Sequence, residues 1–167
     1  MKRIIVIGSG GSGKSTFSRL LGEKLGIPVV HLDRLFWLAG WNRRPTEEWL
    51  DLLNTELEKE SWIMDGNFGA TREMRIRFAD TVIFLDLPRY VCMYRILKRT
   101  LLYRSGQRPD MADGCDERFD PEFIAWVWNF PNESRNRLLE ELRMFPEKNV
   151  ITLKSRTEVK EFLNEVA

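Results

Sequence analysis

The stretch Ile4-Ile5-Val6-Ile7-Gly8-Ser9-Gly10-Gly11-Ser12-Gly13-Lys14-Ser15-Thr16 decides the fold of this chain. Four aliphatic residues predict a buried strand, and the next segment has glycine, four residues and then Gly-Lys-Ser, which predicts a phosphate-binding loop and the start of a helix. The glycines let the loop curl so that backbone N–H groups converge on phosphate oxygens, and Lys14 reaches the outer phosphates. The Ser15 hydroxyl is a ligand for magnesium. We therefore predict that residues 8–16 bind a nucleoside triphosphate.

Length and composition limit the class of protein. The 167 residues, 43% of them hydrophobic, suit a single domain with a sizeable core. Because 26 Lys and Arg balance 25 Asp and Glu, no net field draws the molecule to nucleic acid or to an anionic membrane. Cys92 and Cys115 belong to no CxxC pair, which argues against structural zinc and fits a reducing compartment. The apolar run before Gly8 is too short for a signal peptide or a membrane span, so we expect a cytoplasmic protein.

Short apolar runs alternate with stretches of helical periodicity along the chain. The expected strands are residues 4–7, 29–32, 62–65, 81–85 and 149–153. Among the helices between and after them, we expect Gly26 to end the first, Thr46 to cap the second and Thr157 to precede the last. Strands and helices in this order predict an α/β fold with three layers, in which helices cover both faces of a parallel sheet.

Residues 103–120 break this regularity, because arginines and acidic residues replace the apolar periodicity. A long loop without structure is uncommon in a compact domain unless it closes over a ligand, so we predict a lid insertion at about residues 100–131 within a single domain of residues 1–167. The alternative is a solvated charged loop. The aromatic cluster at residues 123–130 is expected to pack in the core or at the hinge of the lid.

Acidic residues at strand ends are candidates for chemistry, because ligands of open α/β sheets bind outside the carboxyl ends of the strands. Asp65 is expected beside the glycine loop, where it would orient magnesium through water opposite Ser15. Asp33 follows the second strand and is a candidate to accept a proton from a substrate hydroxyl, to bind magnesium or to cap a turn. Asp86 is expected in a turn or at a helix start. His31 is expected to be half-buried, with its ring hydrogen-bonded and no catalytic role.

Transfer of a phosphoryl group needs cations in addition to Lys14, which are usually arginines on a closing segment. Arg95 and Arg99 lie four residues apart on a helix that enters the predicted lid, and Arg135 and Arg137 lie on a helix that leaves it. Arg99 and Arg135 are the candidates for contact with the transferred group. The alternative for any single arginine is a solvated helix face.

Residues 8–16, Asp65-Gly66, residues 80–86 and Arg95-Ile96-Leu97-Lys98-Arg99 resemble the adenylate kinase-like group of P-loop kinases, and the resemblance spans nearly the whole chain. His31-Leu32-Asp33 and residues 62–68, with the arginine-rich lid, are similar to bacterial proteins described as adenylate kinase-related or as DNA topology modulation proteins. The wider resemblance implies a parallel five-stranded P-loop NTPase core of order 2-3-1-4-5, ATP with Mg²⁺, and lid arginines that close over the phosphates. The narrower description establishes no activity.

The chain departs from the adenylate kinase-like pattern at the acceptor site. Such kinases usually follow Asp-Gly with an aromatic residue, proline and an arginine that grips the acceptor phosphate, whereas residues 67–69 here are Asn-Phe-Gly. Substitute clamps are available at Arg72, Arg75, Arg34, Arg43 and Arg44. Because paired arginines bind carboxylate as well as phosphate, the acceptor is as readily a nucleoside, a sugar acid or a shikimate-like hydroxyl compound as a nucleotide.

We therefore expect an ATP-dependent kinase of an unidentified small molecule. Lys14, Arg99, Arg135 and Asp33 are its predicted catalytic residues, and Ser15 and Asp65 are predicted to organise magnesium. An alternative is an ATP-dependent regulatory or DNA-topology-associated protein without such an acceptor. The balanced charge counts against nucleic acid binding, which needs a concentrated basic surface. A third possibility is a binding protein without catalysis.

Overall fold

A five-stranded parallel sheet forms the centre of the molecule. The computed structural model describes residues 1–102, 110–116 and 118–166. The strands of the sheet are β1 (Arg3–Gly8), β2 (Val29–His31), β5 (Trp62–Asp65), β6 (Thr81–Leu85) and β7 (Asn149–Leu153). Their order is β2-β5-β1-β6-β7, and every neighbouring pair is parallel. Counted along the chain this is 2-3-1-4-5, so the predicted fold class and strand order are confirmed.

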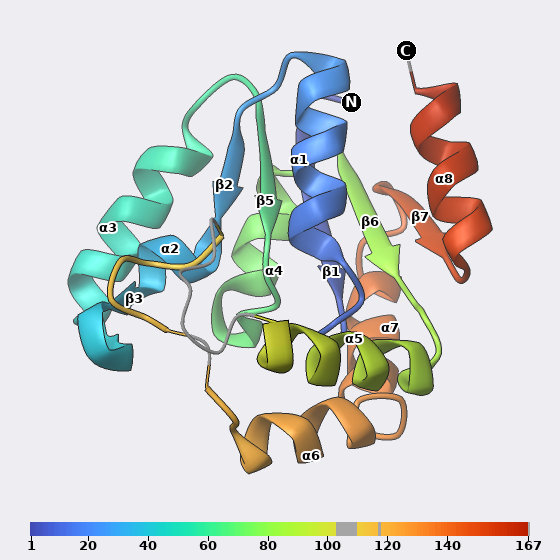
Figure 1. Cartoon of the computed structure of the whole chain (residues 1–167). Coiled ribbons are helices and arrows are strands. Elements are labelled where there is room, and N and C mark those ends of the chain that lie inside the picture. The colour runs from blue at the N-terminus through green and yellow to red at the C-terminus, as the bar shows by residue number, and fades with distance from the viewer. Residues whose placement is uncertain (103–109, 117, 167) are drawn as a thin grey trace.

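Helices cover both faces of the sheet (Figure 1). The helices α1 (Lys14–Leu25) and α8 (Arg156–Glu165) pack on one face, whereas α3 (Thr46–Leu57), α4 (Gly69–Phe78) and α7 (Ser134–Arg143) pack on the other. Alternate side chains of β1 supply the two cores: Ile4 and Val6 face α1, and Ile5 and Ile7 face α3. All four are fully buried. The glycine loop that follows β1 is therefore attached to a buried central strand of the sheet.

Two helices lie across the carboxyl end of the sheet. These are α5 (Arg89–Leu102) and α6 (Pro121–Asn129), which pack on each other through Cys92, Ile96 and Val127 (Figure 1). The aromatic residues predicted for core or hinge packing belong to α6 and the residues after it. The described part of the predicted lid comprises the end of α5, residues 110–116, residues 118–120, α6 and the two residues after Asn129. Its Arg104 and Arg108 lie outside the described residues.

Helix ends agree with the sequence in one case and differ in two. Gly26 ends α1 as predicted. Thr46 does not cap α3: it is the first helical residue, and the preceding Pro45 has no side-chain group to accept a hydrogen bond. Ser155 caps α8, because its hydroxyl accepts the N–H of Glu158 at 3.1 Å, so the helix begins before Thr157 rather than after it.

A small hairpin lies between β2 and α3 and was not predicted. It comprises α2 (Leu32–Phe36), β3 (Trp37–Leu38), the short helix η1 (Ala39–Trp41) and β4 (Asn42–Arg43). Residues 110–116 lie against this hairpin: the Gly40 N–H donates to the Gly114 carbonyl at 2.9 Å, and the Cys115 thiol donates to the Leu38 carbonyl at 3.2 Å. The hairpin and this segment therefore form one wall above the carboxyl end of the sheet. Across residues 1–102, 110–116 and 118–166, no helix has both the length and the apolar character needed to span a bilayer.

Candidate active site

The glycine loop curls between β1 and α1, and two helices press on its outer surface. Gly11 has φ 73°, and a Cβ there would lie 2.3 Å from the Cys92 carbonyl oxygen of α5. A Cβ on Gly10 would lie 2.6 Å from the Phe123 ring of α6. A larger residue at Gly11 would require α5 backbone to move, and one at Gly10 would require the Phe123 and Val127 side chains of α6 to move. The loop is thus closely confined on one side, and its other side lines a cleft.

Lys14 bends back over the loop. Its ammonium group donates to the Gly8 carbonyl at 3.1 Å and to the Ser9 carbonyl at 2.9 Å. Burial lowers the pKa of Lys14 below its ordinary value, and the carboxylates of Asp65 and Asp33 oppose that shift. Backbone carbonyls thus hold the Lys14 ammonium group within the glycine loop. In this position it can bind an anionic group that approaches the loop.

Asp65 ends β5 beside the glycine loop, where the sequence predicts it. It pairs in register with Val6 of β1, and only 5% of its surface is exposed. Its carboxylate contacts His31, whose Nδ1 lies 2.8 Å from the Asp65 Oδ1. Burial lowers the pKa of His31, but the hydrogen bond to Asp65 and the charge of that carboxylate outweigh burial and raise it overall. His31 is half-buried with a hydrogen-bonded ring, as expected, and its partner is the candidate magnesium-organising residue.

Asn67 connects the segment after β5 to the glycine loop. Its side-chain amide donates to the Gly8 carbonyl at 2.8 Å, and its side-chain oxygen accepts the Gly8 N–H at 3.2 Å. The two bonds satisfy both backbone groups of the first loop residue. Sequence reasoning treated Asn67 only as a departure from the acceptor-clamp pattern and did not find this role.

A cleft of about 900 Å³ opens above the loop. Residues 10–16 form its floor, and Asp65, Asp33 and Arg99 line it as well. The cleft therefore brings together most of the predicted loop, both candidate carboxylates and Arg99, which is one of the two candidate arginines. Gly8 and Ser9 lie behind this floor and bind Lys14.

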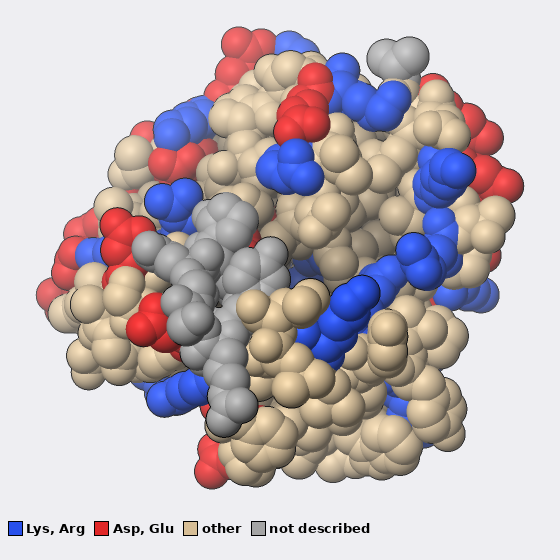
Figure 2. All heavy atoms as spheres, viewed as in Figure 1, with Lys and Arg blue, Asp and Glu red and all other residues tan. Residues whose placement is uncertain are grey.

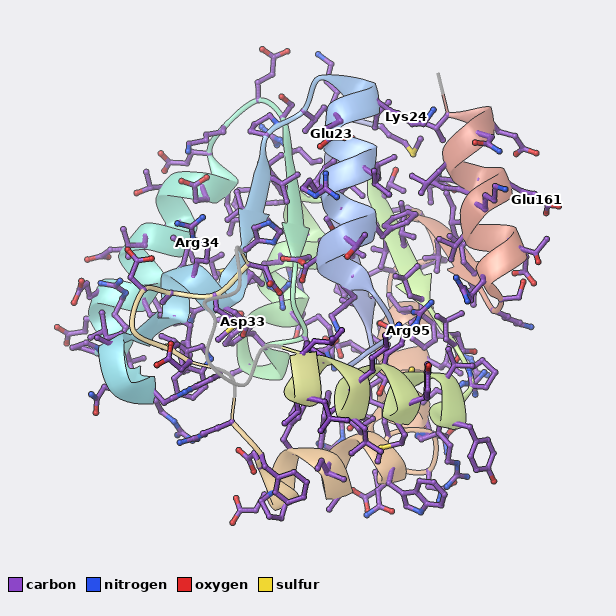
Figure 3. The ribbon with its side chains drawn as sticks, viewed as in Figure 1. Glu23, Lys24, Asp33, Arg34, Arg95 and Glu161 are labelled. Atoms are coloured by element: carbon purple, nitrogen blue, oxygen red, sulfur yellow. The ribbon has the colours of Figure 1, made fainter. Side chains whose placement is uncertain are left out.

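The two sides of the cleft differ in charge. Figure 2 shows Lys and Arg side chains in a band along the α8 side of the central hollow, where Arg95, Arg156 and Lys160 line the cleft. In the view of Figure 3, Arg95 and Asp33 lie on opposite sides of the amino end of α1. Basic groups therefore line the side next to β7 and α8, and a carboxylate lines the side next to α2.

The α5 arginines lie close to the loop. The Arg95 guanidinium donates to the Ser12 carbonyl at 2.9 Å, and burial, together with the charge of Arg156, lowers its pKa. Arg99 lines the cleft one turn further along, and its charge lowers the pKa of Lys14. Two of the predicted arginines are thus placed at the phosphate loop by the i, i+4 spacing of a single helix.

Arg135 is placed elsewhere. Its guanidinium makes a two-pronged ion pair with Asp86, with the shortest contact at 2.7 Å, and Arg135 is not among the described residues that line the cleft. The hydrogen bond to Asp86 raises the pKa of Arg135. Asp86 and Arg135 lie 49 residues apart, so this pairing ties the end of β6 to α7. The structure does not bring Arg135 together with Lys14 and Arg99.

Two of the possible acceptor clamps are committed to the protein itself. Arg75 is fully buried, and it donates to the carbonyls of Gly66 (3.1 Å), Asn67 (2.6 Å) and Phe68 (3.1 Å). Burial lowers the pKa of Arg75 to about 9. Arg72 pairs with Glu141 of α7. Arg75 therefore supports the segment that carries Asn67, and Arg72 joins α4 to α7.

Ser15 and Asp65 fit a magnesium ion that binds together with a nucleotide, rather than an ion held by the protein alone. Within the described residues, no three carboxylate, imidazole or thiol groups gather as a metal site. Ser15 and Asp65 line one cleft and are oxygen donors of the kind that magnesium binds. Because magnesium is usually held by one or two protein oxygens with phosphates and water, these two residues fit an ion that arrives with a triphosphate.

The chain is similar to several solved kinases over nearly its full length. A gluconokinase from Sinorhizobium meliloti 1021 has a TM-score of 0.57 and 18% sequence identity, over 99% of this chain and 89% of that one. A shikimate kinase from Bacteroides thetaiotaomicron has a TM-score of 0.55 and 17% identity, over 98% and 95%. At these identities the likeness shows the fold alone, a parallel five-stranded sheet with helices on both faces that this chain shares with those structures.

Sequence relatives match only in part. Threonine synthase-like 1 of Homo sapiens is 24% identical over 129 residues, which are 67% of this chain and 17% of that protein. Its counterpart in Pongo abelii is 34% identical over 110 residues, 57% of this chain and 15% of that protein. The chain thus spans less than a fifth of the length of these relatives. No protein-family model matches the chain.

Proposed function

We propose that this chain is a cytoplasmic, ATP-dependent phosphotransferase that moves the γ-phosphoryl group of ATP to a hydroxyl of a small molecule. One observation carries the proposal: a single cleft is lined by the glycine loop with Lys14, by Asp65, by Asp33 and by Arg99. A site that only binds a nucleotide does not need a carboxylate and an arginine beyond the phosphates. Residues 95–99, which precede the proposed lid at residues 100–131, favour the adenylate kinase-like group within the P-loop kinases.

The placement of Asp65 supports one orientation of the nucleotide. Ser15 and Asp65 would hold a magnesium ion that binds with the triphosphate, and the ion would neutralise charge on the phosphate oxygens. Because Asp65 lies on β5, an ion held in this way would draw the γ-phosphate end to the β5 side of β1. The base then lies on the other side, towards α8, where Arg95 and Arg156 line the cleft. The acceptor approaches from α2 and the hairpin.

The residues around this end of the cleft have distinct roles in the transfer. Lys14 and Arg99 offset the negative charge that spreads over the phosphoryl oxygens, and bound magnesium supplies further charge neutralisation. Asp33 accepts the proton of the acceptor hydroxyl as the new P–O bond forms. The bond between the γ-phosphorus and the β–γ bridging oxygen breaks, and ADP leaves. The confined loop also positions the phosphoryl group for transfer.

Acceptor-dependent release of ADP tests the proposal. The purified chain is incubated with ATP, Mg²⁺ and a panel of hydroxyl compounds, and ADP is measured with and without each acceptor. Arg99→Ala is expected to lower turnover about a hundredfold, while the Kd for ATP changes only a few-fold. Lys98→Ala, which removes an exposed cation from the same helix, is the control. Turnover that needs duplex DNA instead of an acceptor would favour the regulatory alternative.

A further inference from the structure

The outer side of α5 carries a row of exposed apolar residues. Tyr90, Tyr94, Leu97 and Leu101 follow one another at intervals of four, three and four residues, which places them on one side of the helix. Their exposed fractions range from 44% to 74%. The opposite side of α5 packs on α6 and on the glycine loop. The helix therefore has a second apolar side, which is open to solvent.

Two neighbouring side chains extend this row. Leu102 follows Leu101 at the end of α5 and is also exposed. Trp128 of α6 lies against Tyr90, with the two ring centroids 5.6 Å apart at an angle of 81°. In Figure 2 the surface over α5 and α6 is mostly uncharged, below the basic band that borders the cleft. These residues are called the outer patch, which is defined as Tyr90, Tyr94, Leu97, Leu101, Leu102 and Trp128.

The outer patch is large enough to form most of a protein interface. A buried aromatic side chain covers about 150–250 Å². At the observed exposures, the outer patch leaves on the order of 600 Å² of side chain open to solvent. This is the upper end of the range for apolar patches on monomeric proteins. Because a standard interface buries about 800 Å² on each partner, the patch is typical of a binding surface.

The charges of α5 favour an uncharged partner. The helix contains no acidic residue. Of its basic residues, Arg95 and Arg99 line the cleft, and Arg89 lies over the Trp128 ring with its guanidinium carbon 5.0 Å from the centroid. Lys98 is the one exposed charged residue of α5. An acidic partner or an anionic membrane would therefore meet a single exposed cation of this helix, whereas an apolar surface matches the whole row.

The row on α5 is complementary to itself. Its tyrosines lie in the amino-terminal half of the helix and its leucines in the carboxyl-terminal half. If two copies of α5 pair antiparallel about a two-fold axis, Tyr94 of one copy meets Leu97 of the other, and Tyr90 meets Leu101. Intervals of four and three residues are also the spacing of side chains in the seam between paired helices. Each tyrosine ring then packs on a leucine, while its hydroxyl stays in water at the edge.

We propose that the outer patch binds a second copy of this chain, and that the two α5 helices pair antiparallel across a two-fold axis. This interface goes beyond the proposed phosphotransfer, because it uses the side of α5 that faces away from the cleft. The backbone of the same helix confines the glycine loop at Gly11, and its other side carries Arg95 and Arg99 to the cleft. The second copy therefore supports, from outside, the helix that borders the phosphate loop.

Self-association of the purified full chain is the first test. Sedimentation equilibrium is expected to show a dimer at micromolar chain concentrations, since standard interfaces associate in the micromolar range or more tightly. The dimerisation constant is expected to change little between low and high salt, because apolar contacts form the interface. A chain that remains monomeric at about 1 mM would overturn the proposal.

Substitutions in the row connect self-association to the outer patch. Leu97→Glu and Tyr94→Lys each place a charge in the apolar seam, and each is expected to weaken the dimer about thirtyfold or more. Met144→Glu, which changes an exposed apolar residue after α7, is the matched control and is expected to dimerise like the wild type. Urea titration checks that all three variants are folded. Dimers of both α5 variants as tight as the wild-type dimer would show that the outer patch is not the interface.

A mixture of the two α5 variants tests the antiparallel pairing. Because position 94 of one copy faces position 97 of the other, the two introduced charges meet as an opposite pair in a mixed dimer. The second contact of that dimer keeps its native tyrosine and leucine. An equimolar mixture of Leu97→Glu and Tyr94→Lys is therefore expected to dimerise at a concentration where each variant alone is monomeric. A mixture that stays monomeric while the wild type dimerises would overturn the antiparallel arrangement.

A lipid surface is the other occupant that exposed aromatic and aliphatic side chains bind readily. Cosedimentation with vesicles of phosphatidylglycerol and phosphatidylcholine tests for it. A wild-type chain that is monomeric in solution and binds these vesicles, with binding lost in Leu97→Glu, would overturn the second copy as occupant. None of these measurements needs turnover, so their outcome is independent of whether the chain transfers a phosphoryl group.

Discussion

The two ends of the central sheet use their polar groups differently. At the amino end, the Asp80 carboxylate accepts the N–H groups of Lys2 at 2.7 Å and Arg3 at 2.9 Å, and Lys148 donates to two carbonyls before β6. At the carboxyl end, the Lys14 ammonium folds back onto its own loop, and the Ser12 hydroxyl is buried without a hydrogen-bond partner in the described part of the chain. The polar groups at the amino end bind backbone groups and stabilise the fold. Those at the carboxyl end lie where a ligand can bind.

This contrast separates stability from function in one molecule. Carboxylates and ammonium groups that pair with fixed backbone groups stabilise the folded state. Cations and strained residues that line a cleft add little stability and serve binding instead. Changes at the carboxyl end are therefore expected to lower turnover with small losses of stability, and changes at the amino end to do the reverse.

Replacement of Lys14 is expected to have the largest effect. Lys14→Ala removes the cation on the outer phosphates, so turnover falls about a thousandfold with every acceptor. The free energy of unfolding changes by less than about 1 kcal/mol, because relief from burying this charge offsets the loss of its hydrogen bonds to the Gly8 and Ser9 carbonyls. Urea titration and ADP release measure the two quantities. Lys24→Ala, at the far exposed end of α1, is the control.

If Lys14→Ala lost much of its stability as well as its turnover, the contrast between the two ends of the sheet would fail. The lysine would then contribute to folding. If the two variants had similar urea midpoints and only Lys14→Ala lost turnover, the contrast would be supported.

Asn67 is expected to have an intermediate effect, since it joins the acceptor side to the loop. Asn67→Ala leaves both backbone groups of Gly8 without this partner and is expected to cost about 1 kcal/mol of stability. The loop also loses its fixed position, so turnover falls roughly ten- to hundredfold. The same assays apply, with the exposed Asn54→Ala of α3 as control. Wild-type turnover in Asn67→Ala would show that confinement by α5 and α6 alone positions the loop.

The sequence was sufficient for the features that depend on local patterns. Residues 4–16 predict a strand, a loop and a helix in order, and the five apolar runs predict the sheet that the structure contains. The i, i+4 spacing predicts that Arg95 and Arg99 share a helix face. Each of these predictions concerns residues that are close in the chain or a motif with fixed offsets.

Local sequence patterns could not predict contacts between residues that lie far apart in the chain. Asn67 meets Gly8 across 59 residues and His31 meets Asp65 across 34, through the register of three strands. Helical periodicity placed Arg135 on α7 but could not show that Asp86 is its partner. Left-handed backbone at Trp41 has no sequence signal, because only glycine, asparagine and aspartate adopt it readily.

Asp80 tests the amino end through pH. Its hydrogen bonds with the Lys2 and Arg3 N–H groups and the Thr81 hydroxyl outweigh partial burial and lower its pKa below the ordinary 3.8. Because the folded pKa is the lower one, the stabilisation is present above about pH 4 and is lost as the pH falls through the folded pKa. Asp80→Asn is expected to cost about 1 kcal/mol at neutral pH, with turnover unchanged.

Urea titrations of both proteins between neutral pH and pH 3 measure the effect. The difference in stability between wild type and Asp80→Asn is expected to shrink towards the acidic limit. Asp51→Asn, which changes an exposed carboxylate of α3, is the control. If the difference in stability between wild type and Asp80→Asn stayed constant with pH, the charge of Asp80 would not be what stabilises the amino end of the sheet.

Lys148 is expected to give an effect on stability no larger than that of Asp80, and the cleanest separation of stability from turnover. Its ammonium group donates to the Arg77 and Ala79 carbonyls, both at 2.9 Å, where α4 ends and β6 begins. Lys148→Met keeps the apolar stem and removes both bonds, so the free energy of unfolding falls by about 1 kcal/mol. Turnover and its KM values stay as in the wild type, because Lys148 lies at the opposite end of the sheet from the cleft. If turnover falls while the urea midpoint does not, the amino end of the sheet takes part in function and the division between the two ends fails.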